Sequence, residues 1–123
     1  MSNAKTILVI DDDIDLQQLV KIAIKTKGYT IETANNGLEA LVKLETVTPD
    51  LIILDMNMPK MGGLEFYQRI CDQTSRPKYP VLVLTARANM ESLFKDFNVE
   101  GFMAKPFEID ELLNNVDTIL KKK

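Results

Sequence analysis

Short, wholly apolar runs separated by helical patterns are the feature that most constrains how this chain can fold. Three of them, at residues 7–10, 51–54 and 81–84, contain no polar side chain. Strands that are apolar on both faces are typical of parallel sheets covered by helices on each side. Right-handed crossovers then favour an open, doubly wound sheet, because a closed eight-fold barrel needs about twice this chain length.

The remaining segments complete five strand–helix units. Tyr29, Ile31 and Thr33 alternate with polar neighbours, which predicts an edge strand, and residues 102–104 form a short last strand. Five helices are expected, from residue 14 to about Gly28, from Leu38 onwards, and over residues 64–71, 90–97 and 109–120. The first should bury one face, made of Leu16, Leu19, Val20, Ala23 and Ile24. Because no linker or repeat interrupts the pattern, we expect a single domain over residues 1–123.

Composition excludes several classes of function. The formal net charge of −3 argues against direct nucleic-acid binding, which requires a basic surface. The absence of histidine excludes Ser-His or Cys-His catalysis and histidine-ligated metals. Cys71 is the only cysteine, and the sequence shows neither a signal peptide nor a run of membrane-spanning length. These features predict a cytoplasmic protein with no membrane partner.

Acidic, hydroxyl and basic side chains follow the ends of four predicted strands. They are Asp11, Asp12 and Asp13 after the first strand, Asp55 after the third, Thr85 after the fourth and Lys105 after the fifth. The carboxyl ends of parallel strands share one edge, where open α/β sheets bind their ligands. We therefore expect these groups to converge, although Asp13 alone is better interpreted as a helix cap.

Converging carboxylates repel one another, and a bound divalent cation relieves that repulsion. Ligand sets made only of oxygen favour Mg²⁺, which commonly combines one or two carboxylates with a phosphate. Thr85 offers a hydroxyl and Lys105 a positive charge to phosphate oxygens, and aspartate is a known nucleophile toward phosphoryl groups. A calcium loop of the EF-hand type is excluded, because Leu16 and Ile22 occupy its glycine and glutamate positions.

At these residues the sequence resembles CheY-like receiver domains of two-component response regulators. The resemblance is carried by ILVIDDD at residues 7–13, PDLIILDMNMP at 49–59, LTA at 84–86 and KPF at 105–107. Their order and spacing fit over about residues 5–121. The resemblance implies a flavodoxin-like fold with five helices and strand order 2-1-3-4-5. The chain departs from the family pattern at Gly62, where the family often has aspartate.

The resemblance implies a role for each site residue. Asp55 would accept the phosphoryl group, with Thr85 and Lys105 binding its oxygens. Asp12, Asp55 and the Asn57 carbonyl would bind Mg²⁺, and Asp11 would act mainly through a metal-bound water. Thr85 and Phe102 would form a switch, although Phe102 also suits a simple core position. The Lys105-Pro106 peptide would be cis, with Lys105 facing the acidic site.

The implied phosphoryl source is a sensor histidine kinase or a phosphotransfer protein. Output would pass to a downstream protein or a homodimer through the helix at 90–97, the strand at 102–104 and the helix at 109–120. Such a domain is not an enzyme for external substrates, although self-phosphorylation from small donors and self-dephosphorylation are expected. Two alternatives stay open: a Mg²⁺-dependent phosphohydrolase with an aspartate nucleophile, and a phosphorylation-independent interaction domain. The sequence also leaves open whether this is a single-domain regulator or a receiver separated from an effector.

Overall fold

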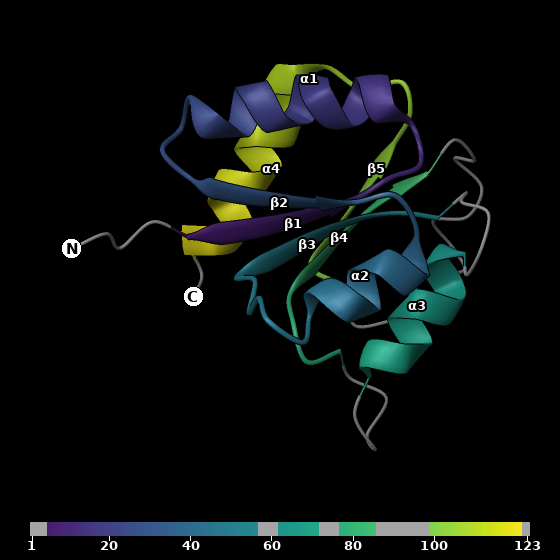
Figure 1. Ribbon diagram of the computed structural model, residues 1–123. Coiled ribbons are helices and arrows are strands. Elements are labelled where there is room, and N and C mark those ends of the chain that lie inside the picture. The colour runs from purple at the N-terminus through teal and green to yellow at the C-terminus, as the bar shows by residue number, and fades with distance from the viewer. Residues whose placement is uncertain (1–4, 57–61, 72–76, 86–98, 122–123) are drawn as a thin grey trace.

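The computed structural model (Figure 1) describes residues 5–56, 62–71, 77–85 and 99–121. Five strands form one parallel sheet in the order β2-β1-β3-β4-β5. They are β1 (Thr6–Ile10), β2 (Thr30–Ala34), β3 (Leu51–Asp55), β4 (Val81–Thr85) and β5 (Gly101–Ala104). The predicted flavodoxin-like strand order is confirmed, as is the edge position of β2.

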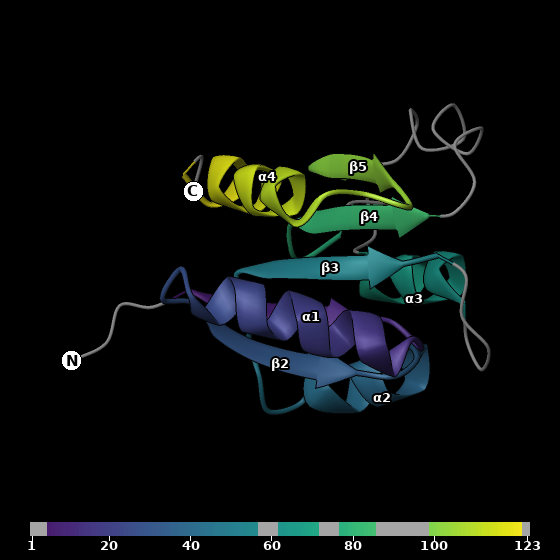
Figure 2. The same cartoon turned by 90° about the horizontal axis from the view of Figure 1, so that it is seen from above.

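Helices cover both faces of this sheet, as the buried strands require. They are α1 (Ile14–Lys25), α2 (Gly37–Lys43), α3 (Gly63–Ile70) and α4 (Ile109–Lys121). Helices α1 and α4 lie on one face, and α2 and α3 on the other (Figures 1 and 2). The helix expected at residues 90–97 lies outside the described residues, so α4 corresponds to the fifth helix of the sequence prediction.

Each central strand contributes to two separate cores. Ile7 and Val9 of β1 pack with residues of α1 and α4, whereas Leu8 and Ile10 pack with residues of α2 and α3. Side chains alternate between the faces of a strand, so a sheet covered on both sides needs apolar residues at every position. This requirement explains the uninterrupted apolar runs.

The first helix corrects one prediction and confirms another. Leu19, expected on the buried face, is 51% exposed, while Gln17 is buried beside Val20 and Ile24. Leu19 is displaced by roughly 140° around the helix from Ile24, which turns it away from the sheet. Asp13 is the predicted helix cap, because its Oδ1 accepts a hydrogen bond from the Leu16 amide at 3.2 Å.

The alternation of strand and helix also separates the two edges of the sheet. The strands end at the carboxyl edge, and the crossover helices α1, α2 and α3 return the chain to the opposite, amino edge. Figure 1 shows that β1 begins and α4 ends on the amino side, away from the strand tips.

A polar cluster joins the start of β2 to α4. The Tyr29 hydroxyl donates a 2.5 Å hydrogen bond to Oδ1 of Asp117, and Lys27 Nζ lies 3.5 Å from the Asp117 Oδ2 atom. Burial, the hydrogen bond to Asp117 and the charge of that carboxylate raise the pKa of Tyr29 to about 12 from 10.0. The protonated phenol is therefore favoured in the folded state.

Replacing Tyr29 with phenylalanine should lower the free energy of unfolding by about 1–2 kcal/mol at neutral pH, because Asp117 loses a donor. The difference in the free energy of unfolding between parent and variant should have its full size below pH 10. It should disappear as pH rises through about 12, since the unfolded chain loses the phenolic proton first. Urea unfolding of both proteins from pH 7 upwards measures the difference. A stability difference that does not change with pH would contradict a hydrogen bond from Tyr29 to Asp117.

Candidate functional site

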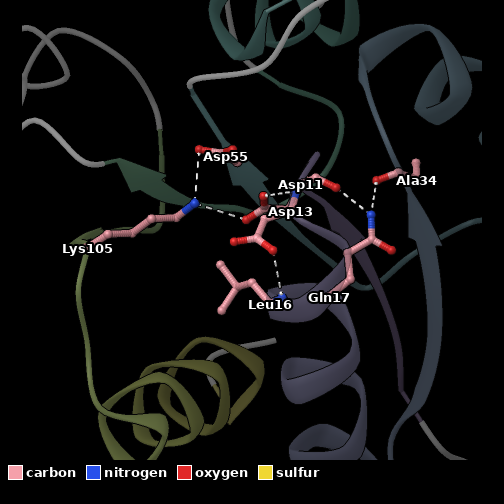
Figure 3. Close-up of polar contacts among 7 residues, drawn as sticks. All are labelled: Asp11, Asp13, Leu16, Gln17, Ala34, Asp55 and Lys105. Atoms are coloured by element: carbon pink, nitrogen blue, oxygen red, sulfur yellow. Dashed lines mark hydrogen bonds and ion pairs between the residues drawn. The ribbon is translucent and has the colours of Figure 1, made fainter.

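The predicted polar residues come together at the carboxyl edge of the sheet. Asp11 directly follows β1, Asp55 ends β3, Thr85 ends β4 and Lys105 directly follows β5. Asp11, Asp55 and Thr85 are at most 1% exposed. Figure 3 shows Lys105 reaching from the end of β5 toward Asp11 and Asp55. Residues more than 90 positions apart thus share one site because their strands are neighbours.

Lys105 is the positive charge of this site. Its Nζ lies 3.1 Å from Oδ2 of Asp11 and 3.4 Å from Oδ1 of Asp55. Burial lowers the pKa of Lys105, but the hydrogen bond to Asp11 and the two carboxylate charges outweigh it, so the pKa is raised overall. The ammonium group therefore stays protonated at neutral pH and compensates part of the buried negative charge.

Three carboxylates form a cluster beside this ammonium. Asp11, Asp12 and Asp55 each offer one oxygen, and these oxygens lie within 4.8 Å of one another. Two oxygens on opposite sides of a Mg²⁺ ion are about 4.2 Å apart, so small side-chain movements suffice to bind one. Asp12 is exposed, unlike the other two. The donor set fits a hard divalent cation that retains contact with solvent.

Gln17 makes hydrogen bonds at this site that the sequence patterns did not reveal. Its buried side chain donates hydrogen bonds to the backbone carbonyl oxygens of Asp11 and Ala34, which belong to neighbouring strand ends (Figure 3). The sequence did hold one signal for this residue. Gln17 stands three positions before Val20 and seven before Ile24, which puts a polar side chain on the inner face of α1. Only the location of the Ala34 carbonyl explains why a polar side chain is satisfied there.

Thr85 and Phe102 lie on the same face of the sheet. In the parallel pairing of β4 with β5, Val83 is opposite Phe102 and Thr85 is opposite Ala104. Phe102 is partly buried against the core cluster that contains Val83. The two predicted switch residues are therefore close neighbours on adjacent strands.

The backbone around the site is closely packed. A Cβ atom at Gly63 would lie 2.6 Å from the Asp55 carbonyl oxygen and 2.7 Å from the Met56 Cα, so α3 begins directly against the end of β3. Gly62, at the position where the resemblance leads one to expect aspartate, precedes α3 without a side-chain cap. The Lys105-Pro106 peptide is cis, as predicted. Asn57, the fourth predicted metal ligand, lies outside the described residues.

No helix in the described ranges combines the length and the apolar character needed to cross a bilayer.

Comparison with known proteins gives consistent results. The family model for the response regulator receiver domain matches residues 7–117. The chain is 37% identical to the alkaline phosphatase synthesis transcriptional regulatory protein PhoP of Bacillus subtilis, over 96% of this chain and 49% of that protein. It is 33% identical to the response regulator MprA of Mycobacterium ulcerans, over 94% and 50%. It thus spans about half the length of these curated relatives.

Solved structures match over nearly the whole chain. The chemotaxis response regulator CheY4 of Vibrio cholerae has a TM-score of 0.84 and 34% identity, covering 95% of this chain and 99% of that one. The response regulator TrrA of Thermotoga maritima, solved in complex with Mg²⁺-BeF, has a TM-score of 0.81 and 35% identity, covering 94% and 98%.

Proposed function

The chain belongs to the response regulator receiver domain family, and we propose that Asp55 is the residue that accepts the phosphoryl group. The observation that carries this proposal is a buried carboxylate lying both in a three-carboxylate cluster and 3.4 Å from the Lys105 ammonium. Receiver domains are typically signalling modules rather than enzymes for external substrates. The family assignment therefore does not favour the phosphohydrolase alternative.

The site residues divide the chemistry among them. An Asp55 oxygen attacks the donor phosphorus, the bond to the donor breaks, and the donor leaves with that bond's electron pair. Asp11, Asp12, Asp55 and the Asn57 carbonyl would hold Mg²⁺, which supplies charge neutralisation for the phosphoryl oxygens. Lys105, whose Nζ lies 3.4 Å from Oδ1 of Asp55, would bind one phosphoryl oxygen, and the Thr85 hydroxyl would donate to another.

The donor in the cell would be a sensor histidine kinase or a phosphotransfer protein, consistent with the two-component family. Output would pass to a downstream protein or a homodimer through β5, α4 and the segment at residues 90–97, which lies outside the described residues. The net charge of −3 favours a protein partner over nucleic acid for this chain.

Intact-mass analysis tests the proposed function directly. Incubation with a small acyl-phosphate donor and Mg²⁺ should add one labile phosphoryl group per chain. Omission of Mg²⁺ should prevent the addition, because the carboxylate cluster would then repel the incoming phosphate. A parent protein that gains no phosphoryl group under these conditions would overturn the proposal.

Replacing Asp12 with alanine should weaken Mg²⁺ binding by at least about tenfold, since a ligand is lost. Asp12 is exposed, so the only gain on its removal is relief of its repulsion with Asp11 and Asp55. That relief should raise the metal-free free energy of unfolding by about 1 kcal/mol. Calorimetric Mg²⁺ titration and urea unfolding measure both effects, with exposed Asp15→Ala as the matched control. Equal Mg²⁺ affinity in parent and variant would refute the ligand role.

Phosphorylation should move Thr85 and Phe102 together. Three new acceptor oxygens at Asp55 attract the Thr85 hydroxyl, and its movement opens space on the face it shares with Phe102. Amide spectra with Mg²⁺ and a stable phosphoryl mimic should therefore shift at Phe102 and at residues 93–97, as well as around Asp55. In Thr85→Ala the distant shifts should disappear while phosphorylation persists. Their survival in that variant would exclude Thr85 as the relay.

A further inference from the structure

Gln17 is a buried polar side chain that the proposed chemistry does not use. Only 3% of it is exposed. Besides the carbonyl oxygens of Asp11 and, at 3.1 Å, Ala34, its Nε2 donates to Oδ1 of Asn35 at 2.8 Å. Figure 3 shows the side chain projecting from α1 between the ends of β1 and β2. Building on the proposed function, we infer that Gln17 is a positioning residue for the metal-binding carboxylates Asp11 and Asp12.

The orientation of this amide follows from its neighbours. The Glu39 carboxylate has only acceptors, so Asn35 must turn its Nδ2 toward it, at 3.4 Å from Oε2. The backbone N–H of Asn35 also donates to Glu39, at 3.0 Å from Oε1, and this bond fixes the carboxylate in place. The Asn35 Oδ1 atom then faces Gln17 as an acceptor. Since the other two partners are carbonyl oxygens, Gln17 must present Nε2 to them, and its two N–H groups are shared among the three acceptors.

These contacts fix the peptide group that joins Asp11 to Asp12. The Ala34 carbonyl accepts from the Asp11 amide at 3.1 Å as well as from Gln17, so both backbone polar groups of Asp11 are tied to the end of β2. The Asp11 carboxylate is further held by the Asp13 amide at 2.9 Å and by Lys105. The exposed Asp12 side chain takes its direction from the backbone that Gln17 holds.

Burial alone does not account for a glutamine at this position. Gln17 occupies the inner face of α1 with Val20 and Ile24, where an apolar side chain of similar size would avoid the cost of burying an amide. An amide nitrogen that bonds to acceptors on three different residues instead fixes local geometry. Outer contacts of this kind orient the ligands of metal sites, and their loss typically weakens metal binding about 10–100-fold.

The test replaces Gln17 with methionine, which keeps its length and removes the donor. Mg²⁺ affinity, measured by calorimetry without any phosphoryl donor, should fall roughly tenfold. The Mg²⁺ concentration for half-maximal phosphorylation should rise by the same factor, while the rate at saturating Mg²⁺ changes by less than about threefold. Gln17→Glu should lower Mg²⁺ affinity further, because its carboxylate oxygen would face the three acceptor oxygens that Gln17 now bonds to. Gln17→Asn, which retains the amide at shorter reach, should have a smaller one.

Two controls separate positioning from general stability. Gln18→Met makes the same substitution at an exposed position of α1 and should leave Mg²⁺ affinity unchanged. Val20→Ala destabilises the same helix from within its core and should also leave affinity unchanged at a temperature where it is folded.

Each outcome supports or overturns a defined claim. Unchanged Mg²⁺ affinity in Gln17→Met, or an equal loss in Val20→Ala, overturns the positioning role. If Gln17→Met does not fold, the asparagine and glutamate variants decide by the same measurement. A parent that binds Mg²⁺ without being phosphorylated at Asp55 overturns the proposed function, while the affinity measurement still judges Gln17. A parent that binds no Mg²⁺ overturns both.

Discussion

Replacing Asp55 with asparagine should abolish the phosphoryl adduct formed from a small acyl-phosphate donor and Mg²⁺. Asparagine has nearly the same shape, but its neutral amide is a poor nucleophile toward phosphorus. Asp55 is buried, and its Oδ1 lies 3.4 Å from the Lys105 ammonium that would bind a phosphoryl oxygen. We expect the adduct to fall below detection by intact-mass analysis.

The same substitution should leave the protein folded. It removes one of two buried carboxylates that share the Lys105 ammonium, and their mutual repulsion is relieved. Asp15→Asn, an exposed substitution in α1, is the matched control and should retain the full adduct. An undiminished adduct in folded Asp55→Asn would show that the phosphoryl group resides elsewhere.

Replacing Lys105 with methionine should cause the largest loss of stability. Asp11 and Asp55, with side chains 1% and 2% exposed, would lose the ammonium that lies 3.1 Å and 3.4 Å from their oxygens. Removing one partner of a buried ion pair typically costs about 3–5 kcal/mol, and the partial exposure of Lys105 favours the lower end of that range. Phosphorylation should also slow strongly, because a phosphoryl oxygen loses its ammonium partner.

Urea unfolding with and without Mg²⁺ measures this prediction. The cation replaces part of the missing positive charge. The difference in the free energy of unfolding between variant and parent should therefore become smaller when Mg²⁺ is added. Lys43→Met is the control, because Lys43 pairs with Glu32 at 2.9 Å in a partly exposed position. This substitution should lower the free energy of unfolding by less than about 1 kcal/mol. Equal losses in the two variants would show that Lys105 is an ordinary surface lysine.

The stabilisation by Lys105 should also depend on pH in a defined direction. Its pKa in the folded state is raised above the usual 10.5, so the folded protein retains this proton at pH values where the unfolded chain has lost it. The contribution should be complete below pH 10.5 and be lost as pH rises through the raised value. The stability difference between parent and Lys105→Met should therefore shrink at strongly alkaline pH.

The sheet and the edge that carries the site could be predicted because they depend on local patterns. Apolar runs such as residues 51–54 identify buried parallel strands, and the residue that follows each run necessarily lies at the carboxyl edge. The exposure of Asp12 was not predicted. Asp11 continues the alternation of β1 and is buried, whereas Asp12 belongs to the turn that follows.

The role of Gln17 could not be predicted, because its partners Ala34 and Asn35 are supplied by the end of another strand. Hydrophobic periodicity correctly placed Val20 and Ile24 on the inner face of α1, but it also placed Leu19 there, which is exposed. Periodicity counts apolar residues but does not show which carbonyl oxygens lie opposite a helix. Buried polar contacts over long sequence separations are therefore the part of this site that required coordinates.

The separation of the two sheet edges has a practical consequence for handling the protein. Asp55 lies at one end of a five-residue strand, and β1 begins and α4 ends toward the other end of the sheet (Figure 1). A five-residue strand is about 17 Å long. A fluorophore, affinity tag or surface anchor attached before Thr6 or after Lys121 therefore leaves the approach of a phosphoryl donor unobstructed. Either attachment point suits immobilised kinetic measurements on the intact site.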